Sequence, residues 1–301
     1  MTADRWPAPP ARRWTAERRV RERRWLEALH AQQHDPGKLA PDPLQLVVPF
    51  AAPADREVVG LVAACLAYGN VTAMLPAIRR VLAVLGPAPA ATLDGLTDAD
   101  LHAALAGFRY RVTTGERVAG LLAAVRRVRS THGSLEAAMA ARDDGGPTIV
   151  GGLSGLVGTL RAASPAPLDH LLPDPAGGSA CKRPALWLRW LVRHDAIDPG
   201  GWTGTDPARL LMPIDTHVFQ TARRRRWTRR RTVNLATAME ITARLRELEP
   251  ADPLRWDFAI TRPGIRGRRD DAPPAPPPSS GAASRIAWPG VRSDGSATRT
   301  G

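Results

Sequence analysis

The segment Leu211–Arg231 reads LMPIDTHVFQTARRRRWTRRR and carries the main indication of the fold. Asp215 stands directly ahead of a run whose apolar residues have helical spacing. A short acid in that position is typical of a helix start, because its carboxylate accepts a hydrogen bond from the first turn. Seven arginines follow between Arg223 and Arg231. An acid beside so much positive charge indicates either a simple helix cap or a site where a polyanion reacts.

The composition favours a folded protein with an anionic partner. The chain has 301 residues, a hydrophobic share of 44%, a formal net charge of +13 and a pI near 11.3. Nucleic acid is the first candidate partner for such a charge. The seven arginines of the segment 223–231 supply more than half of the excess charge, so a local docking surface explains it better than a general bias towards arginine.

The two cysteines, Cys65 and Cys181, exclude a disulfide framework and a four-cysteine metal or iron–sulfur site. They fit a reducing cytoplasm, and the N-terminus has no apolar signal sequence. We therefore expect a cytoplasmic, nucleoid-associated monomer without a metal or other cofactor. The uncharged stretch 58–78 is long enough to cross a bilayer. Gly69 and Asn70 lie at its centre, so two buried helices meeting at a turn are the better explanation, and we expect no membrane contact.

Helical spacing of apolar residues recurs along the chain, whereas alternating strand patterns are nearly absent. Apolar side chains share one helical face in the segment 118–128. Thr97 and Asp100 form a pattern that is typical of a capping box. Further helices are expected from Ser134 and from Thr232. The sequence thus predicts an all-α protein with about ten helices.

Composition also divides the chain into segments. Both ends are rich in Pro, Arg, Ser and Gly, with too few apolar residues to fold, and a Pro- and Gly-rich linker interrupts the helical body. The expected segments are a disordered N-terminus (1–13), a helical body (14–265) with lobes at about 14–163 and 179–265, a linker (164–178) and a disordered tail (266–301).

Lys182 stands out because the chain has only two lysines among its 42 basic residues. The other, Lys38, lies in the polar loop HDPGKLAPDP. Lys182 lies in SACKRPALWLRWLVR, just before an apolar, Trp-rich helix. An amine can lose its proton when it is desolvated and attack carbon, whereas a guanidinium stays protonated. Lys182 is therefore either a Schiff-base nucleophile or an ordinary charge at a helix start.

The motif PIDTHVFQTARR, residues 213–224, resembles the signature of the helix-hairpin-helix base-excision glycosylases, the endonuclease III superfamily. With the blocks 55–71, 107–112 and 179–198, the chain resembles more closely a bacterial family of conserved hypothetical proteins, a domain of unknown function, over roughly residues 40–265. The resemblance implies a two-lobed helical fold with a cleft between the lobes. It also implies a DNA-repair glycosylase that acts on damaged duplex DNA.

The same resemblance assigns the catalytic residues. The motif aspartate of the superfamily, Asp215 here, would stabilise the positive charge that develops at C1′ of the nucleotide. Bifunctional members add a lysine that attacks C1′ and gives AP lyase activity, and the only candidate is Lys182, 33 residues earlier. That wide spacing is similar to the spacing in the archaeal oxoguanine glycosylases. The glycine-rich hairpin string of the superfamily is absent, and PAGGSACKR is the nearest segment.

The reacting nucleotide must leave the base stack, so the resemblance also implies contacts around it. Asn70 would fill the vacated stack, or would simply belong to a turn. Tyr68 would stack on a base or lie in the core, and the arginines would contact phosphates or face solvent. The expected nucleic-acid-binding residues are Asn70, Tyr68, His217, Arg223, Arg224, Arg229, Arg230 and Arg231.

Two other functions remain open at this point. The chain could be a non-catalytic nucleic-acid-binding protein of the same fold, which the missing hairpin favours. More weakly, it could be an enzyme that acts on RNA or on free nucleotides.

Overall fold

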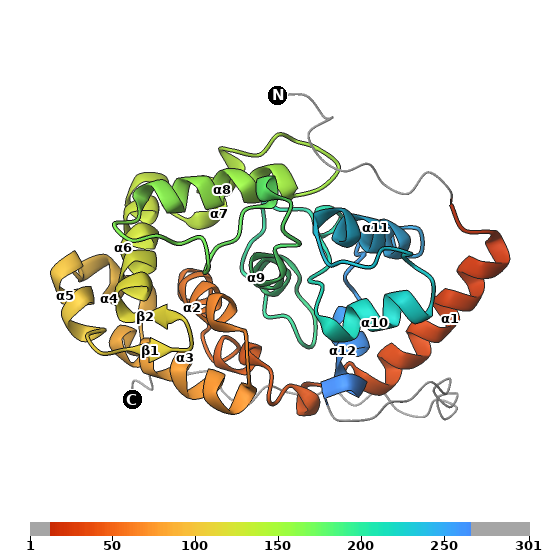
Figure 1. The fold of residues 1–301 in the computed structure, drawn as a ribbon, viewed down its shortest axis with the longest axis horizontal. Coiled ribbons are helices and arrows are strands. Elements are labelled where there is room, and N and C mark those ends of the chain that lie inside the picture. Colours follow the sequence, from red (N-terminus) through yellow and green to blue (C-terminus); the bar gives the residue numbers. More distant parts are fainter. Residues whose placement is uncertain (1–12, 266–301) are drawn as a thin grey trace, which may run out of the picture.

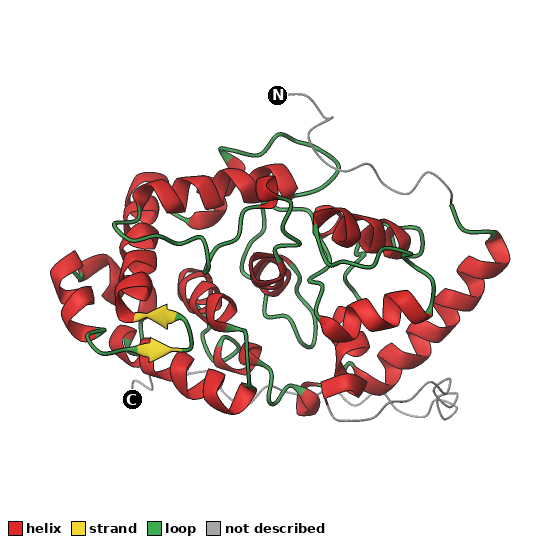
Figure 2. Ribbon diagram, viewed as in Figure 1, coloured by secondary structure: helices red, strands yellow, loops and turns green. Residues whose placement is uncertain are grey.

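Helices dominate the computed structural model, which describes residues 13–265 (Figure 1, Figure 2). The α-helices are α1 (Ala16–Gln33), α2 (Pro53–Leu66), α3 (Val71–Leu85), α4 (Pro89–Gly95), α5 (Asp98–Ala104), α6 (Gly115–His132), α7 (Leu135–Ala140), α8 (Val150–Ala163), α9 (Lys182–Val192), α10 (Thr216–Arg224), α11 (Leu235–Arg246) and α12 (Asp257–Ile265). Four short 3₁₀ helices and a two-stranded hairpin complete it: η2 (Pro36–Lys38), η3 (Pro43–Leu46), η4 (Pro175–Gly177), η5 (Pro207–Arg209), β1 (Arg109–Tyr110) and β2 (Thr113–Thr114).

The mostly helical class is confirmed, with twelve α-helices within residues 13–265 where the sequence predicted about ten. The disorder expected at residues 1–13 and 266–301 lies outside the described residues, except for Arg13.

Local sequence signals correspond closely to helix starts and faces. The apolar face of the segment 118–128 is buried in α6, and Thr97 and Asp100 form a reciprocal capping box at the start of α5. The Ser134 side chain caps α7. The start expected at Thr232 is displaced, because Asn234 is the residue whose side chain caps α11.

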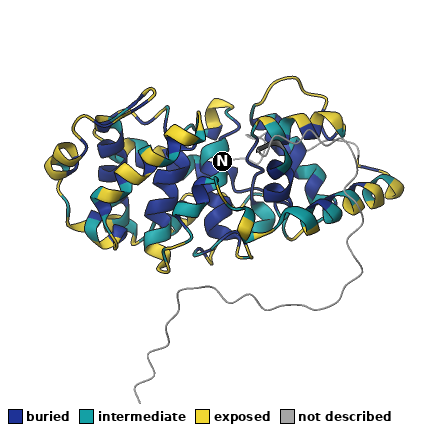
Figure 3. Cartoon of the chain, turned by 90° about the horizontal axis from the view of Figure 1, so that it is seen from below, coloured by how far each residue is buried: buried dark blue, intermediate teal, exposed yellow. Residues whose placement is uncertain are grey.

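Buried apolar side chains form one continuous cluster that extends from the N-terminal region to α12 (Figure 3). The predicted linker takes part in it, since Leu168, Leu171 and Leu172 are all buried. Residues 164–178 are therefore packed chain rather than an exposed tether. The division into two lobes stays a prediction.

The uncharged stretch 58–78 is two helices, as the sequence predicted. After α2 ends, Gly69 takes a φ of +81°, and Asn70 starts α3 by accepting a hydrogen bond from the backbone N–H of Thr72 at 2.9 Å. Among the described residues, no single helix has the length and hydropathy to cross a membrane. Within residues 13–265, α3 and α4 taken together, with a bend of 60° between them, are the only helix pair that meets those two criteria.

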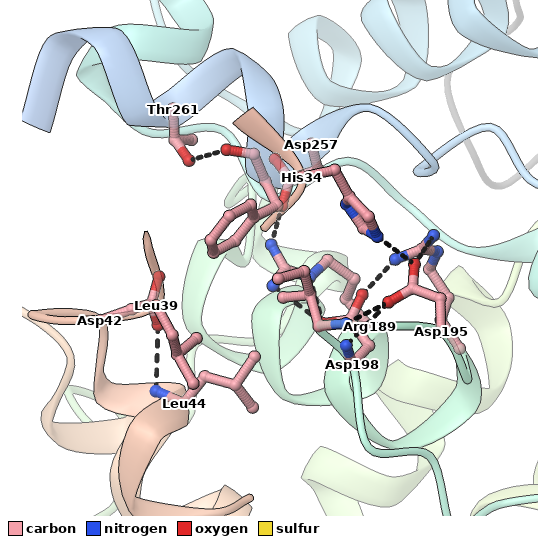
Figure 4. Close-up of polar contacts among 12 residues, drawn as sticks. His34, Leu39, Asp42, Leu44, Arg189, Asp195, Asp198, Asp257 and Thr261 are labelled. Carbon is pink, nitrogen blue, oxygen red and sulfur yellow. Dashed lines mark hydrogen bonds and ion pairs between the residues drawn. The ribbon is translucent and has the colours of Figure 1, made fainter. Parts of the chain in front are cut away.

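A buried ion-pair network surrounds the second half of α9 (Figure 4). Arg189 donates to Asp198 at 2.9 Å and also to Asp257 at the start of α12. Arg193 donates to Asp198 and, at 2.9 Å, to Asp252. Asp198 is completely buried, and Arg189 and Asp257 are each 2% exposed. Charges this deep are tolerated because each has partners of opposite sign.

The end of α1 joins the same network through a pair of histidines. The rings of His30 and His34 are stacked with their centroids 4.2 Å apart. Nε2 of His34 lies 3.4 Å from a carboxylate oxygen of Asp195, which in turn accepts a hydrogen bond from Arg193 at 2.7 Å (Figure 4). The N-terminal helix is thereby attached to the loop that follows α9.

Replacement of Asp198 by asparagine is expected to lower the free energy of unfolding by about 3–5 kcal/mol, because Arg189 and Arg193 lose a buried counter-charge. The control is Asp169→Asn, since Asp169 pairs with Arg161 at 2.9 Å but its side chain is 76% exposed. That change should cost less than about 1 kcal/mol. Urea denaturation measures both values, and similar losses for the two variants would contradict a dominant role for the buried network.

Replacement of His30 by glutamine is expected to reduce the loss of stability on acidification. Burial, with the neighbouring His34, lowers the pKa of His30 from 6.5 to about 4. Between those values the unfolded chain binds more protons than the folded one, so the free energy of unfolding falls as the pH is lowered through this window.

Burial acts in the opposite direction on Asp257, whose pKa it raises to about 6, so the informative quantity is the difference between wild type and variant. Urea denaturation at about pH 7 and about pH 4.5 measures that difference. An identical pH dependence for both proteins would exclude His30 as a source of acid sensitivity.

Candidate functional site

Asp215 is the N-cap of α10. One oxygen of its carboxylate, Oδ1, accepts a hydrogen bond from the backbone N–H of Val218 at 2.7 Å. The residue is half-buried, and its side chain makes no other hydrogen bond or ion pair within residues 13–265. The position is favourable for a carboxylate, because the N-terminal end of a helix carries partial positive charge. Asp215 therefore has a structural role as a cap and still has one carboxylate oxygen without a partner in the part of the chain that the structure describes.

Asp257 is a site residue that the sequence reasoning missed. α10 packs against α12, and the negative charge of Asp215 contributes to the raised pKa of Asp257, for which burial is the largest cause. Oδ1 of Asp257 is buried and has no hydrogen-bond partner among the described residues. In the sequence DPLRWDFAI, the apolar neighbours of this aspartate are the only indication that it is buried. Its depth of burial and its electrostatic interaction with Asp215 are evident only from the tertiary structure.

Lys182 is the first residue of α9 and is half-buried. Its amine makes no hydrogen bond or ion pair with any part of the chain that the structure describes, so no ion pair joins it to Asp215. The next residue, Arg183, donates to the carbonyl oxygens of Cys65, at 3.0 Å, and of His170. No carboxylate within residues 13–265 pairs with Arg183 either. The start of α9 thus carries two adjacent cations without an acid.

Tyr68 lies in a group of side chains next to the start of α9. Its ring centroid is 5.0 Å from those of Tyr110 and His170, and the Arg183 guanidinium lies 5.3 Å from it. The Tyr68 hydroxyl makes a hydrogen bond with Thr113 at 2.7 Å. The ring is therefore held within the protein by several partners, and its stacking on a base stays a prediction.

The other two expected contact residues differ in their surroundings. Asn70 is exposed and is occupied as the cap of α3, which agrees with the turn alternative and leaves its insertion into DNA as a prediction. His217 is half-buried in the first turn of α10, two residues after Asp215.

The basic run that begins in the last turn of α10 and continues beyond it forms a surface that we call the arginine cluster, defined as Arg223–Arg226 and Arg229–Arg231. All of its members except the half-buried Arg225 are exposed. Arg223 donates to the carbonyl of Arg230 at 2.6 Å, so it also fixes the shape of the loop. Arg230 pairs with Glu240 at 3.1 Å. The cluster is therefore an ordered, largely exposed cationic surface at the C-terminal end of α10.

Neither cysteine is suited to nucleophilic chemistry. Cys65 and Cys181 are buried, and burial raises the pKa of each thiol to about 12. Both are protonated near neutral pH, and the thiolate is the reactive form. Among residues 13–265, no group of three or more His, Cys, Asp or Glu residues is arranged to hold a metal ion.

Comparison with known proteins identifies a family without an assigned activity. Residues 42–266, more than half of the chain, match the family model described as "Protein of unknown function (DUF2400)". No curated protein and no solved structure matched the chain. The matched range covers α2 to α12 and excludes α1.

The sequence predicts that the arginine cluster binds DNA, and on that prediction simultaneous replacement of Arg229, Arg230 and Arg231 by glutamine should weaken the salt dependence of binding. Each phosphate neutralised adds about 0.9 to the slope of log affinity against log salt, so the slope should fall by up to about 2.7. Because Arg230 already pairs with Glu240, the decrease in slope should be smaller than that limit. Fluorescence anisotropy on duplexes of unrelated sequence measures the slope, and an unchanged slope would mean that these arginines do not face the nucleic acid.

Proposed function

The chain belongs to the DUF2400 family, and we propose that it is a DNA-repair base-excision glycosylase with Schiff-base AP lyase activity. The observation that carries the proposal is a pair of reactive groups that have no partner within residues 13–265, the amine of Lys182 and one carboxylate oxygen of Asp215, each at the start of a helix. Most other carboxylates in this region, such as Asp198, are held by arginines. A charged group left unpaired in a half-buried position lowers the stability of the fold, and a function in binding or catalysis is a reason for its presence.

Asp215 supplies the electrostatic part of the proposed chemistry. When the bond between the base and C1′ breaks, the base takes the bonding electrons and C1′ becomes positively charged. The carboxylate oxygen that is not engaged in capping α10 stabilises that charge. The cap itself holds the side chain in place before the reaction, so no reorganisation is needed.

Lys182 supplies the nucleophile. Its neutral amine attacks C1′ as the base departs, the amine loses a proton, and the departing base gains one. The C1′–O4′ bond then breaks, O4′ gains a proton, and the nitrogen lone pair forms the C1′=N bond of a Schiff base. Loss of a proton from C2′ expels the 3′ phosphate, which cleaves the strand. Lysine suits this step because its amine can deprotonate, and this is the step that the forty arginines of the chain cannot perform.

The arginine cluster supplies the DNA contacts. α10 has nine residues, so at 1.5 Å per residue its length separates Asp215 from the cluster by roughly 14 Å. Arginines that bind phosphates at one end of the helix would fix the position of the duplex relative to the carboxylate at the other end. The target nucleotide must then be extruded from the stack to reach Asp215.

A non-catalytic nucleic-acid-binding protein is the second candidate. Asp215 and Asn70 both have ordinary capping roles. The segment before α9 is a single 3₁₀ turn, η4, and the carbonyl of Gly178 accepts a hydrogen bond from the backbone of Leu235 at 2.9 Å. These observations favour a fold that binds DNA through its arginines without performing chemistry.

Replacement of Asp215 by asparagine is expected to lower base excision by on the order of a hundredfold, because the variant loses the charge that stabilises C1′. Asparagine is also a good cap, so the fold and DNA affinity should persist. The control is Asp206→Asn, since Asp206 caps η5 through the same carboxylate-to-backbone contact. Base release from a panel of duplexes, each with one damaged base, measures both, and normal turnover by the Asp215 variant would reduce Asp215 to a cap.

Replacement of Lys182 by arginine is expected to abolish covalent trapping on an abasic duplex in the presence of borohydride. The change keeps the positive charge and removes the amine that can form a Schiff base. Lys38→Arg alters the only other lysine and should trap as the parent chain does. Full trapping by the Lys182 variant would assign the chemistry to another amine, and no trapping by the parent chain would remove the lyase activity from the proposal.

A further inference from the structure

α1 lies outside the family-matched residues 42–266, yet it contacts the arginine cluster directly. One guanidinium nitrogen of Arg18 donates to the carbonyl oxygens of Arg225 and Arg226, at 2.9 Å each. These carbonyls lie at the C-terminal end of α10, where backbone carbonyl groups have no N–H partners within the helix. Figure 1 shows α1 alongside α10 at one end of the molecule. Arg18 therefore connects the helix to the first part of the cluster.

A buried acid of α1 fixes the same loop from a second point. Glu22 is 3% exposed, and its Oε2 accepts hydrogen bonds from Nε of Arg225 at 2.7 Å and from the indole N–H of Trp227 at 3.0 Å. The guanidinium of Arg225 also lies 3.8 Å from the ring centroid of Trp25. These contacts lie on one side of α1 and hold the loop after α10 against it. Exposed charged side chains that flank this side of α1 therefore lie on the same surface as the arginine cluster.

Arg21 and Arg24 are the exposed cations beside these contacts. Residues three or four positions apart are neighbours on a helix surface, so Arg21 lies next to both Arg18 and Trp25, and Arg24 lies next to Arg21. The side chain of Arg21 is 68% exposed, and the acid that pairs with it among the described residues, Glu22, is 3.9 Å away and already bound to Arg225. Arg24 is exposed and has no ion pair within residues 13–265. Within residues 13–265, Arg24 has no acidic partner, and Arg21 has only one that is bound more closely by Arg225.

Positive charges are concentrated where α1 meets the loop. The pKa of Arg18 is lowered mainly by burial, and the positive charges of Arg21, Arg225 and Arg244 lower it further, against the favourable effect of Glu22. Concentrated like charge costs free energy in the isolated protein and is compensated when a polyanion binds. Duplex DNA, with one negative charge per ~1.7 Å of its axis, fits an extended surface of this sign.

We propose that α1 and the arginine cluster form one continuous phosphate-binding surface for duplex DNA, to which α1 contributes Arg21 and Arg24. The inference rests on the proposed action on DNA and extends it, because it adds a DNA contact from a helix outside the family-matched range. Arg18 and Glu22 are positioning residues in this arrangement, since they hold the loop without facing the duplex themselves.

The test is the salt dependence of duplex binding by the full chain with Arg21→Gln and Arg24→Gln together. The expected slope of log affinity against log salt is shallower by up to about 1.8, so between about 50 and 200 mM salt the parent chain loses roughly tenfold more affinity than the variant. The control is Arg79→Gln with Arg142→Gln, which removes two exposed arginines from α3 and the loop after α7, away from α1. It should leave the slope unchanged.

The outcomes separate the inference from the proposed function. A slope that stays at the parent value in the Arg21/Arg24 variant, or that falls equally in the control, would overturn the inference alone. Binding to phosphatidylglycerol vesicles that depends on Arg21 and Arg24, with an unchanged DNA slope, would overturn it in favour of a membrane surface. A parent chain that does not bind duplex DNA would overturn the proposed function itself.

Discussion

The buried pairing of Arg189 and Arg193 with Asp198 is the constraint around which the C-terminal half is arranged. A fully buried carboxylate needs strong partners in a low-dielectric interior, and Asp198 has two guanidinium groups, one from Arg189 in α9 and one from Arg193, the residue that directly follows the helix. Arg189 then reaches Asp257 and Arg193 reaches Asp252, so α9 is bound to both the start of α12 and the loop before it. α10 packs on α12, and the position of the candidate carboxylate, Asp215, therefore depends on these ion pairs.

The network contains more acids than bases, and the pKa of one of its carboxyl groups, Asp257, is raised. Four aspartates surround two arginines. Burial raises the pKa of Asp257 to about 6, and the negative charges of Asp215 and Asp198 add to this effect against the opposing effect of Arg189. One carboxylate near α10 can therefore hold a proton under mildly acidic conditions. The charge that Asp215 experiences consequently changes with pH even though Asp215 itself is not part of the network.

Features that depend on neighbouring residues were predictable from the sequence, whereas features that depend on distant ones were not. Helix starts at Thr97 and Ser134, and the cap at Asp215, follow from side chains that bond within their own first turn. The pairing of Glu22 with Arg225 joins residues 203 positions apart, and periodicity carries no information about such a choice. For the same reason Asp257 was missed, and Arg225 could not be distinguished from its exposed neighbours.

The attachment of α1 shows that the family-matched range and the folded body have different limits. Trp227 is 1% exposed, and its indole N–H donates a hydrogen bond to the carboxylate of Glu22, which lies upstream of residue 42. Leu26 and Leu29 of the same helix are buried in the core. A chain trimmed to the matched residues would expose apolar surface and leave Arg225 without its carboxylate. Sequence families record what related proteins share, and here part of what completes the core lies in a segment that the family description does not include.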